Sequence, residues 1–136
     1  DFRKLVAMKK KPANYLLIIC EDVRSEVDDK FSLIGVTAHP LKLKKTQGKS
    51  YATHSIAVYG ELPNVKAPEQ LEILVESPSG KTVAEGIAPV PEKSADTVVV
   101  AGKFLGVRFE ESGKHSLTLS LDGQKYSKEF DIEIIE

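Results

Sequence analysis

The chain has 136 residues, with 19 basic and 20 acidic side chains and a formal net charge of −1. A chain of this length fits one domain that buries about two-thirds of its unfolded surface, so a hydrophobic core can form without disulfides or metal. The balanced charge lacks the basic excess of nucleic-acid-binding proteins, so we expect no nucleic-acid partner. A single cysteine excludes an internal disulfide and fits a reducing compartment.

The first fourteen residues are expected to be an N-terminal extension, and residues 15–136 the folded domain. Met8 is the only methionine, so we interpret residues 1–7 as upstream or added sequence. No apolar run approaches the roughly 20 residues that cross a bilayer. The run Tyr15–Cys20 is also shorter than a signal peptide's hydrophobic region of about seven or more residues, and charged residues follow at once. We therefore predict that this run is a strand, and we expect the protein to be cytoplasmic.

Tyr15–Val23 and Phe31–Val36 are predicted to pair as the opening strands. The first is apolar on both faces, with Leu17 and Ile19 on one face and Cys20 on the other. A strand with two apolar faces is expected to lie centrally and to be covered on both sides. We expect its second face to be covered by the N-terminal segment, a loop or another chain.

Alternation with a period of two residues predicts the remaining strands. The clearest pair is His115–Leu121 with Lys125–Ile135, because Asp122 and Gly123 between them are a preferred pair for a tight hairpin turn. Further strands are predicted at Ser55–Leu62, Leu71–Val75, Thr82–Gly86, Val98–Val100 and Phe104–Phe109. The segments Leu71–Val75 and Thr82–Gly86 are expected to form a second hairpin.

The segments between these strands are irregular. Thr37–Thr53 and Ala88–Asp96 are expected to be loops or edge segments, and Gly102 and Gly106 to mark bends or bulges. About seven to nine short strands, with no long helical stripe, predict a single-domain antiparallel β-sandwich of the immunoglobulin-like kind. The cysteines and tryptophan of the antibody core are absent, since the chain has one cysteine and no tryptophan.

Acidic side chains crowd the segment that follows the first predicted strand. The candidate metal ligands are Glu21, Asp22, Asp28 and Asp29. Calcium takes about six to eight oxygen ligands, often from clustered carboxylates, although the spacing of an EF-hand loop is absent. A calcium-dependent or lipid-associating domain is therefore one hypothesis. The other is a solvated turn whose charges pair with Arg24 and Lys30.

An enzyme site assembled from Cys20, His39 or His54 is a further hypothesis. A nucleophilic thiol needs a nearby base, and no local spacing in the sequence supplies one. Cys20 ends an apolar run, where a free cysteine is commonly buried. The segment "SPSGKT", Ser77–Thr82, resembles the end of a phosphate-binding loop, but it joins two predicted strands and is interpreted as a β-turn. We predict no catalytic residue and no cofactor.

A small basic patch lies in the first irregular stretch. Its members are Lys42, Lys44, Lys45 and Lys49. Such a patch can contact phosphate or an acidic partner, but aromatic side chains for stacking on bases are missing apart from Tyr51. We favour a solvated loop or an edge strand protected by lysines.

The segment "LLIICEDVRSEVDDKFSLIGV" resembles the opening of a family of short bacterial proteins of unknown function. The matching residues are Cys20, Glu21, Asp22, Lys30, Ser32, Leu33, Ile34, Gly35 and Val36. The resemblance extends loosely to the turn at Pro78, Gly80 and Lys81 and to the final hairpin, and it covers residues 15–135. It implies a single β-sandwich domain in a bacterial cytoplasm, and it implies no reaction, cofactor or catalytic residue.

These observations predict a non-enzymatic protein-interaction or structural module. Such a module acts through sheet faces or edges, by strand addition or by self-association. The two-sided apolar first strand and Leu74, which breaks the alternation of its own strand, are features expected at a buried face. The calcium-dependent domain and the enzyme remain the alternatives.

Overall fold

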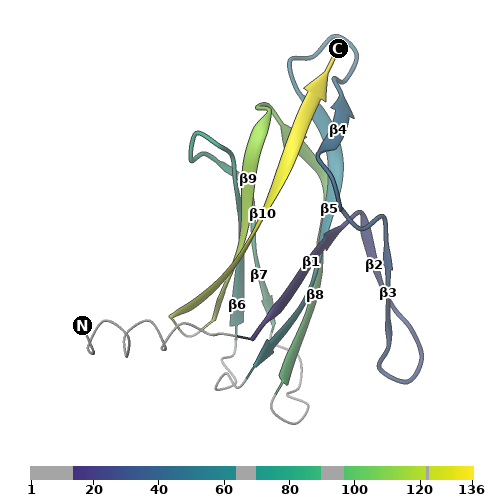
Figure 1. Ribbon diagram of the computed structural model, residues 1–136, viewed down its shortest axis with the longest axis vertical. Helices are drawn as coiled ribbons and strands as arrows, with labels where there is room; N and C mark the ends of the chain where they lie inside the picture. Colours follow the sequence, from purple (N-terminus) through teal and green to yellow (C-terminus); the bar gives the residue numbers. More distant parts are fainter. Residues whose placement is uncertain (1–13, 64–69, 90–96, 122) are drawn as a thin grey trace.

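Strands account for most of the chain in this computed structural model, which describes residues 14–63, 70–89, 97–121 and 123–136 (Figure 1). They are β1 (Leu16–Cys20), β2 (Asp22–Ser25), β3 (Phe31–Ile34), β4 (Leu41–Lys44), β5 (Ala52–Pro63), β6 (Gln70–Glu76), β7 (Thr82–Pro89), β8 (Thr97–Phe109), β9 (Gly113–Leu121) and β10 (Gln124–Ile135). These residues form no helix, so the all-β, single-domain prediction is confirmed. Nearly all of the predicted N-terminal extension lies outside the described residues.

The strands form three sheets. One has three strands in the order β1-β5-β8, one has five in the order β4-β10-β9-β6-β7, and β2 and β3 form a separate two-stranded ribbon (Figure 1). Neighbouring strands are antiparallel except β4 and β10, which are parallel. The expected count of about seven to nine strands is exceeded among the described residues, because the first predicted strand is divided and one predicted loop contains β4.

The final hairpin is confirmed. Leu121 at the end of β9 pairs with Gln124 at the start of β10, so the turn between them has two residues. Gly123 has a positive φ of 77°, as such a turn requires. Asp122, the other predicted turn residue, lies outside the described part. The predicted β6–β7 hairpin is also confirmed, with a register shift near Val75.

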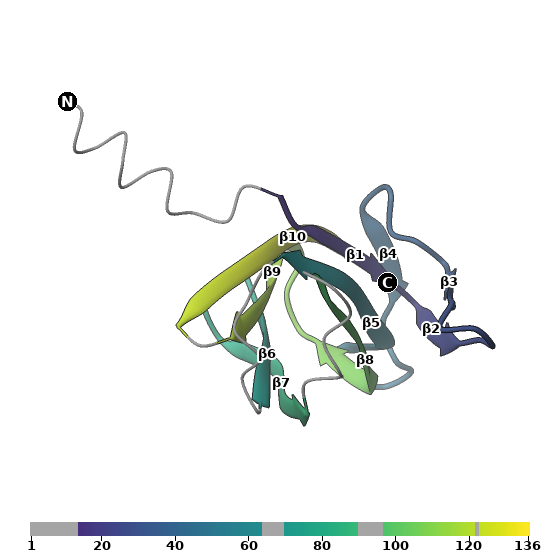
Figure 2. The ribbon, with the colours of Figure 1, turned by 90° about the horizontal axis from the view of Figure 1, so that it is seen from below.

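The hydrophobic core lies between the two larger sheets, which face each other as two layers in Figure 2. The three-stranded sheet contributes Leu17, Ile19, Ile56, Val58, Leu62, Val98 and Val100, and the five-stranded sheet Leu71, Ile73, Leu117, Leu119, Tyr126 and Phe130. Full burial of each large apolar side chain contributes about 1.5–3 kcal/mol. The alternation along each strand thus sets which residues enter the core.

The predicted pairing of the opening strands is wrong in part. β1 pairs with β5, while only β2 pairs with β3. The chain leaves the sheet at Glu21, whose backbone N–H donates to the carbonyl oxygens of Ile34 at 3.0 Å and Gly35 at 3.2 Å. These bonds turn the chain outward, so the predicted strand Tyr15–Val23 is split.

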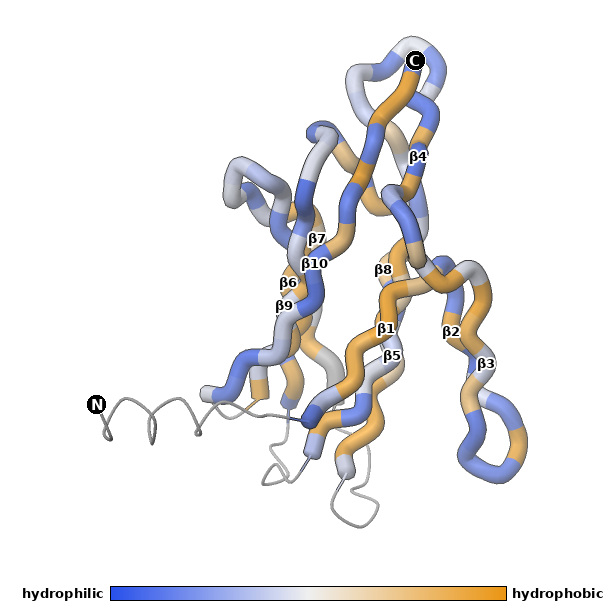
Figure 3. The backbone as a smooth tube through the Cα atoms, viewed as in Figure 1, coloured by the Kyte–Doolittle hydropathy of each residue, from blue (hydrophilic) through white to orange (hydrophobic). Residues whose placement is uncertain are grey.

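The ribbon lies on the side of the three-stranded sheet away from the five-stranded sheet (Figures 1 and 2). The ring of Phe31 on β3 lies 5.6 Å from that of Tyr59 on β5. Cys20 is 1% exposed yet does not belong to the main core cluster, because its side chain faces this outer side. Hydrophobic residues accordingly run along β1 almost without interruption, whereas β10 alternates (Figure 3). The ribbon therefore helps to cover the second apolar face of β1.

β8 is one strand, whereas two were predicted. Gly102 stays in register with β5, so the bend expected there is absent. The bulge expected at Gly106 is confirmed, because the register shifts there and its φ is +62°. Ser55 of β5 stands opposite both Leu105 and Gly106 at this point. The extra residue changes the direction of the side chains on the outer face.

β4 occupies one edge of the five-stranded sheet and lies within a segment expected to be a loop or edge. Its Leu43 is buried, while Lys42 and Lys44 are exposed. Lys45 follows the strand and its Nζ lies 2.6 Å from a carboxylate oxygen of Glu136. This arrangement confirms the interpretation of an edge strand protected by lysines. Among the described residues, no helix is long and apolar enough to cross a membrane.

Candidate functional site

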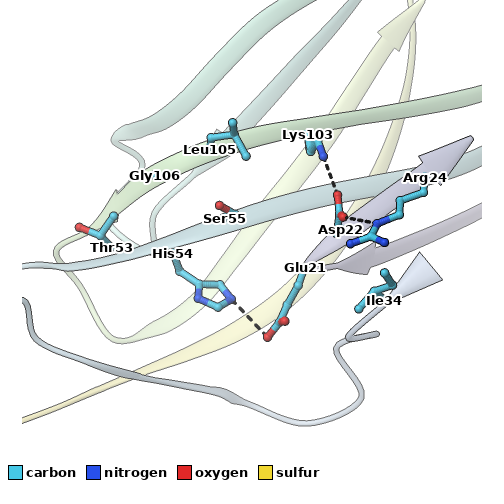
Figure 4. Close-up of a pocket in the computed structure, with 10 residues that line it drawn as sticks. All are labelled: Glu21, Asp22, Arg24, Ile34, Thr53, His54, Ser55, Lys103, Leu105 and Gly106. Carbon is cyan, nitrogen blue, oxygen red and sulfur yellow. Dashed lines mark hydrogen bonds and ion pairs between the residues drawn. The ribbon is translucent and has the colours of Figure 1, made fainter. Parts of the chain in front are cut away.

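A groove of about 620 Å³ lies between the ribbon and the outer face of the three-stranded sheet (Figure 4). Its lining residues are Glu21, Asp22, Arg24 and Ile34 on the ribbon side, and Thr53, His54, Ser55, Lys103, Leu105 and Gly106 on β5 and β8. The groove adjoins the bulge at Gly106. Bulges often occur beside functional sites, because they redirect neighbouring side chains.

Asp22 is the centre of the charged part of the groove. Nζ of Lys103 lies 2.6 Å from one carboxylate oxygen of Asp22, and Nε of Arg24 lies 3.0 Å from the other (Figure 4). The hydrogen bond from Lys103, followed by that from Arg24, lowers the pKa of Asp22 to about 2. Asp22 is therefore ionised at neutral pH and does not act as a general acid. The predicted pairing with Arg24 is confirmed, while that with Lys103 was not foreseen.

Glu21 approaches His54 across the mouth of the groove. Nε2 of His54 lies 3.7 Å from the Glu21 carboxylate, beyond hydrogen-bond distance, and this nitrogen is buried without a partner in the described structure. Gly35 makes room for Glu21, because a Cβ on Gly35 would lie 2.8 Å from that side chain. The φ of Gly35 is +67°, so a substitution there is also strained.

Cys20 does not have the surroundings of a nucleophile. Burial is the main cause that raises the pKa of its thiol, whereas an activated thiol has a lowered pKa. Its Sγ donates to the backbone carbonyl of Asp22 at 3.3 Å. The ring of His54 faces Glu21, and His39 lies exposed outside the groove. The structure thus does not join the cysteine and the histidines into a nucleophile and its base.

The four candidate metal ligands are divided between the two ends of the ribbon. Glu21 and Asp22 lie at its base, while Asp28 and Asp29 form its far turn with φ values of 60° and 55°. Among the described residues, no three histidine, cysteine, aspartate or glutamate side chains come close enough to hold a metal ion. The calcium hypothesis stays a prediction. An unchanged melting temperature in millimolar calcium would reject it, because a ligand of the folded state must raise stability.

The segment Ser77–Thr82 forms a turn between β6 and β7, as expected. The N–H of Gly80 donates to the carbonyl of Ser77 at 2.9 Å, and Gly80 has a φ of +86°. Oγ of Ser79 donates to Glu111 at 2.6 Å, and this hydrogen bond is the main cause that lowers the pKa of Glu111. The turn is therefore held by contacts within itself and with Glu111, and it joins two strands, whereas a phosphate-binding loop opens a helix.

Two apolar side chains flank the groove. Leu105 is 75% exposed on β8, and Ile34 is 40% exposed at the end of β3. The sequence predicted a bend or a bulge at Gly106, but it did not show that the preceding leucine would face solvent. The charges of Asp22, Lys103 and Arg24 are paired within the chain, whereas Leu105 and Ile34 expose apolar surface beside them.

Comparisons of the chain with protein-family models, with curated proteins and with solved structures find no match. The resemblance to a bacterial family therefore depends on the residues of the sequence quoted above, and no comparison supports it. Function is inferred from the geometry of the groove and from the side chains that line it.

Proposed function

We propose that this chain is a non-enzymatic protein-interaction module, and that its partner docks on the groove beside the ribbon. The observation that carries the proposal is the exposure of Leu105 at the bulge of β8, where it lines the groove. A large apolar side chain held outward from a sheet loses little conformational freedom when a partner covers it. Together with Ile34 it offers an apolar contact across a polar groove, as protein interfaces do.

The charged residues of the groove favour a protein partner over a small charged ligand or a reaction. Asp22 is neutralised by Lys103 and Arg24, so the groove presents no unpaired cluster of one sign. The buried thiol of Cys20 is held in its protonated form by its raised pKa. An interaction through apolar contacts needs none of these groups to react, and the ion pair between Asp22 and Lys103 instead joins the ribbon to the sheet.

The finer architecture we propose is an immunoglobulin-like sandwich. Its support is the strand order, in which β5, β6, β7, β8 and β9 pass between a three-stranded and a five-stranded sheet in the manner of Greek-key connections. The ribbon is an insertion between the first strand and β4. An experimentally determined structure with a different sheet order would reject this assignment.

A bacterial cytoplasmic setting is proposed from the resemblance of the opening segment. Cell fractionation of a bacterial host with an untagged copy of the native gene tests it, with an antibody as the probe. Recovery in the cytosolic fraction is the expected result. Recovery in the periplasm or the membrane would contradict the proposed setting.

The interaction is tested by affinity purification with three baits: the unaltered chain, Leu105→Asp and Val27→Asp. Val27 is the matched control, because it is 79% exposed but lies at the tip of the ribbon away from the groove lining. We expect the unaltered bait and the Val27 variant to recover the same partner, which is another protein or a second copy of the chain. The Leu105 variant should not recover it. Light scattering separates a second copy from another protein. Identical recovery with all three baits, or a monomer that binds nothing, would reject the groove as the interface.

A further inference from the structure

A second surface lies at the opposite edge of the five-stranded sheet from β4. β7 is the outermost strand there, and no strand among the described residues pairs with its outer side. Glu85 and Ile87 alternate with Ala84 and Gly86 along it, and Ile87 is 65% exposed. An unpaired edge offers backbone donors and acceptors to an incoming strand.

The two edges of this sheet are protected differently. β4 has four residues and carries two exposed lysines, which are common means of preventing unwanted strand pairing. β7 has eight residues and contains no lysine or arginine. Its bulge lies at one end, near Thr82, so the stretch from Ala84 to Ile87 is regularly paired with β6 on its inner side. The proline of β7 is its last residue, Pro89, and β8 of the other sheet lies close to β7. The stretch from Ala84 to Ile87 is therefore the part of this edge that lacks lysine and proline.

On the outer face beside this edge, acidic and apolar side chains alternate along β6 and β7 and also across the pair. The lining residues of a shallow groove there are Glu72, Ile73, Leu74, Glu85, Gly86 and Ile87. Glu72 stands opposite Ile87, and Leu74 stands opposite Glu85. Neither glutamate forms an ion pair within the part of the chain that the structure describes. The face therefore presents two unpaired carboxylates next to two apolar side chains.

The geometry points to β7 as a site of strand addition for an extended segment of a partner protein. That segment carries a basic and an apolar side chain two residues apart. Outward-facing residues of a strand recur every second position, so one residue of the segment lies opposite Glu85 and the next on that face lies opposite Ile87. Opposite charges and apolar pairs are the favourable cross-strand neighbours for these two residues. Backbone hydrogen bonds then supply affinity, and the two side chains supply specificity.

The inner side of the edge adds a second requirement. A Cβ placed on Gly86 would lie 3.2 Å from the ring of Phe104 on β8, so there is little room at this point. Phe104 is partly buried against the core cluster. The inward side chains of the added strand therefore meet an aromatic ring and small neighbours, and small or uncharged residues fit there.

A second copy of the chain fits this edge less well. Pairing β7 with β7 of another copy would gather Glu72 and Glu85 from both chains on one face, without a basic residue among them. Like charges that face each other across strands are destabilising. The surface is also separate from the groove beside the ribbon, with which it shares no lining residue.

The test is a titration of the ¹⁵N-labelled chain with a synthetic peptide of about eight residues. Every second residue of the peptide is threonine, and the residues between are lysine and valine in turn. We expect chemical-shift changes in the amides of Val83–Ile87, and about fivefold weaker binding for Glu85→Lys. Glu133→Lys is the matched control, because Glu133 is an exposed acid on β10 of the same sheet and should leave the affinity unchanged. A peptide with glutamate in place of lysine, and one methylated at alternate backbone nitrogens, should not bind.

Three results would overturn the inference. The first is the absence of any shift at about 1 mM peptide, the weak limit of a specific contact. The second is a set of shifts that lies outside β7. The third is a dimer in light scattering that Glu85→Lys converts to a monomer, which would assign the edge to a second copy. Leu105→Asp should leave peptide binding unchanged, so failure of this inference and failure of the groove as an interface are distinguished.

Discussion

The two faces of the three-stranded sheet are made by alternate residues of the same strands and have different surroundings. On β5, Ile56 and Val58 face the core, whereas Ala57 and Tyr59 face outward. The inner face packs against the five-stranded sheet and holds most of the buried core residues of these strands. The outer face is covered by the ribbon at one end only and remains open at the groove. Alternate side chains of one strand thus stabilise the core on one face and form the molecular surface on the other.

The ribbon is held to the outer face by few contacts, and they differ in kind from those of the core. Asp22 joins it to Lys103, and Phe31 joins it to Tyr59. Core contacts bury apolar area from many directions, while these contacts are partly exposed to water. Substitutions should therefore lower the free energy of unfolding most on the inner face, less under the ribbon and least at the groove.

The largest effect is expected for Ile56→Ala on the inner face. This substitution leaves a cavity at a residue that is almost fully buried, and we expect it to lower the free energy of unfolding by about 2–5 kcal/mol. Urea unfolding measures the change. Ser55→Ala, one residue earlier and facing the groove, is the control, with a change of about 0.5 kcal/mol or less. A loss below about 1 kcal/mol for Ile56→Ala would contradict the position of the core.

A smaller effect is expected for Phe31→Ala under the ribbon. The ring is half-buried and packs on one aromatic partner, so the expected loss is about 1–2 kcal/mol. The same variant should raise the rate at which a thiol reagent modifies Cys20, because the ribbon then opens more often. Val27→Ala is the control and should not change that rate. Equal rates in the Phe31 variant and the unaltered chain would show that the ribbon does not protect Cys20.

The ion pairs at the base of the ribbon should appear as a pH dependence. The pKa of Asp22 is about 2 in the folded chain, below its ordinary value of 3.8. The stability that it contributes is therefore present above about pH 4 and is lost as the pH falls toward 2. We expect Asp22→Asn to be less stable than the unaltered chain at pH 6, with a difference that shrinks between pH 4 and pH 2. Denaturant midpoints measured across this range, with Asp28→Asn as control, test the expectation. A constant difference would contradict it.

The smallest effect on stability is expected for Leu105→Asp at the groove. Its side chain is mostly exposed, so the free energy of unfolding should change by about 0.5 kcal/mol or less in either direction. Thermal or urea unfolding measures this change. A decrease of more than about 1.5 kcal/mol in the free energy of unfolding would mean that Leu105 stabilises the fold. Loss of partner binding in Leu105→Asp would then not be specific to the groove.

Much of the local structure followed from the sequence. The final hairpin was predicted from alternation and from the pair Asp122-Gly123. The lysines around β4 indicated a solvated loop or a protected edge, and Gly106 a bend or a bulge; the structure has the edge and the bulge. The burial of Cys20 was also expected from the apolar run that it ends. These features depend on neighbours within a few residues, or on the two faces of one strand, and such patterns are visible in a single chain.

The groove was decided by tertiary structure. Lys103 is 81 residues from Asp22, and nothing local to either residue indicates the other. The sequence showed that β1 has two apolar faces, but it did not show that a ribbon from the same chain would help to cover one of them. Alternation reports which faces of a strand avoid water, because it reflects burial at each position. It does not report which strands become neighbours, since that choice depends on how all of the faces are covered together.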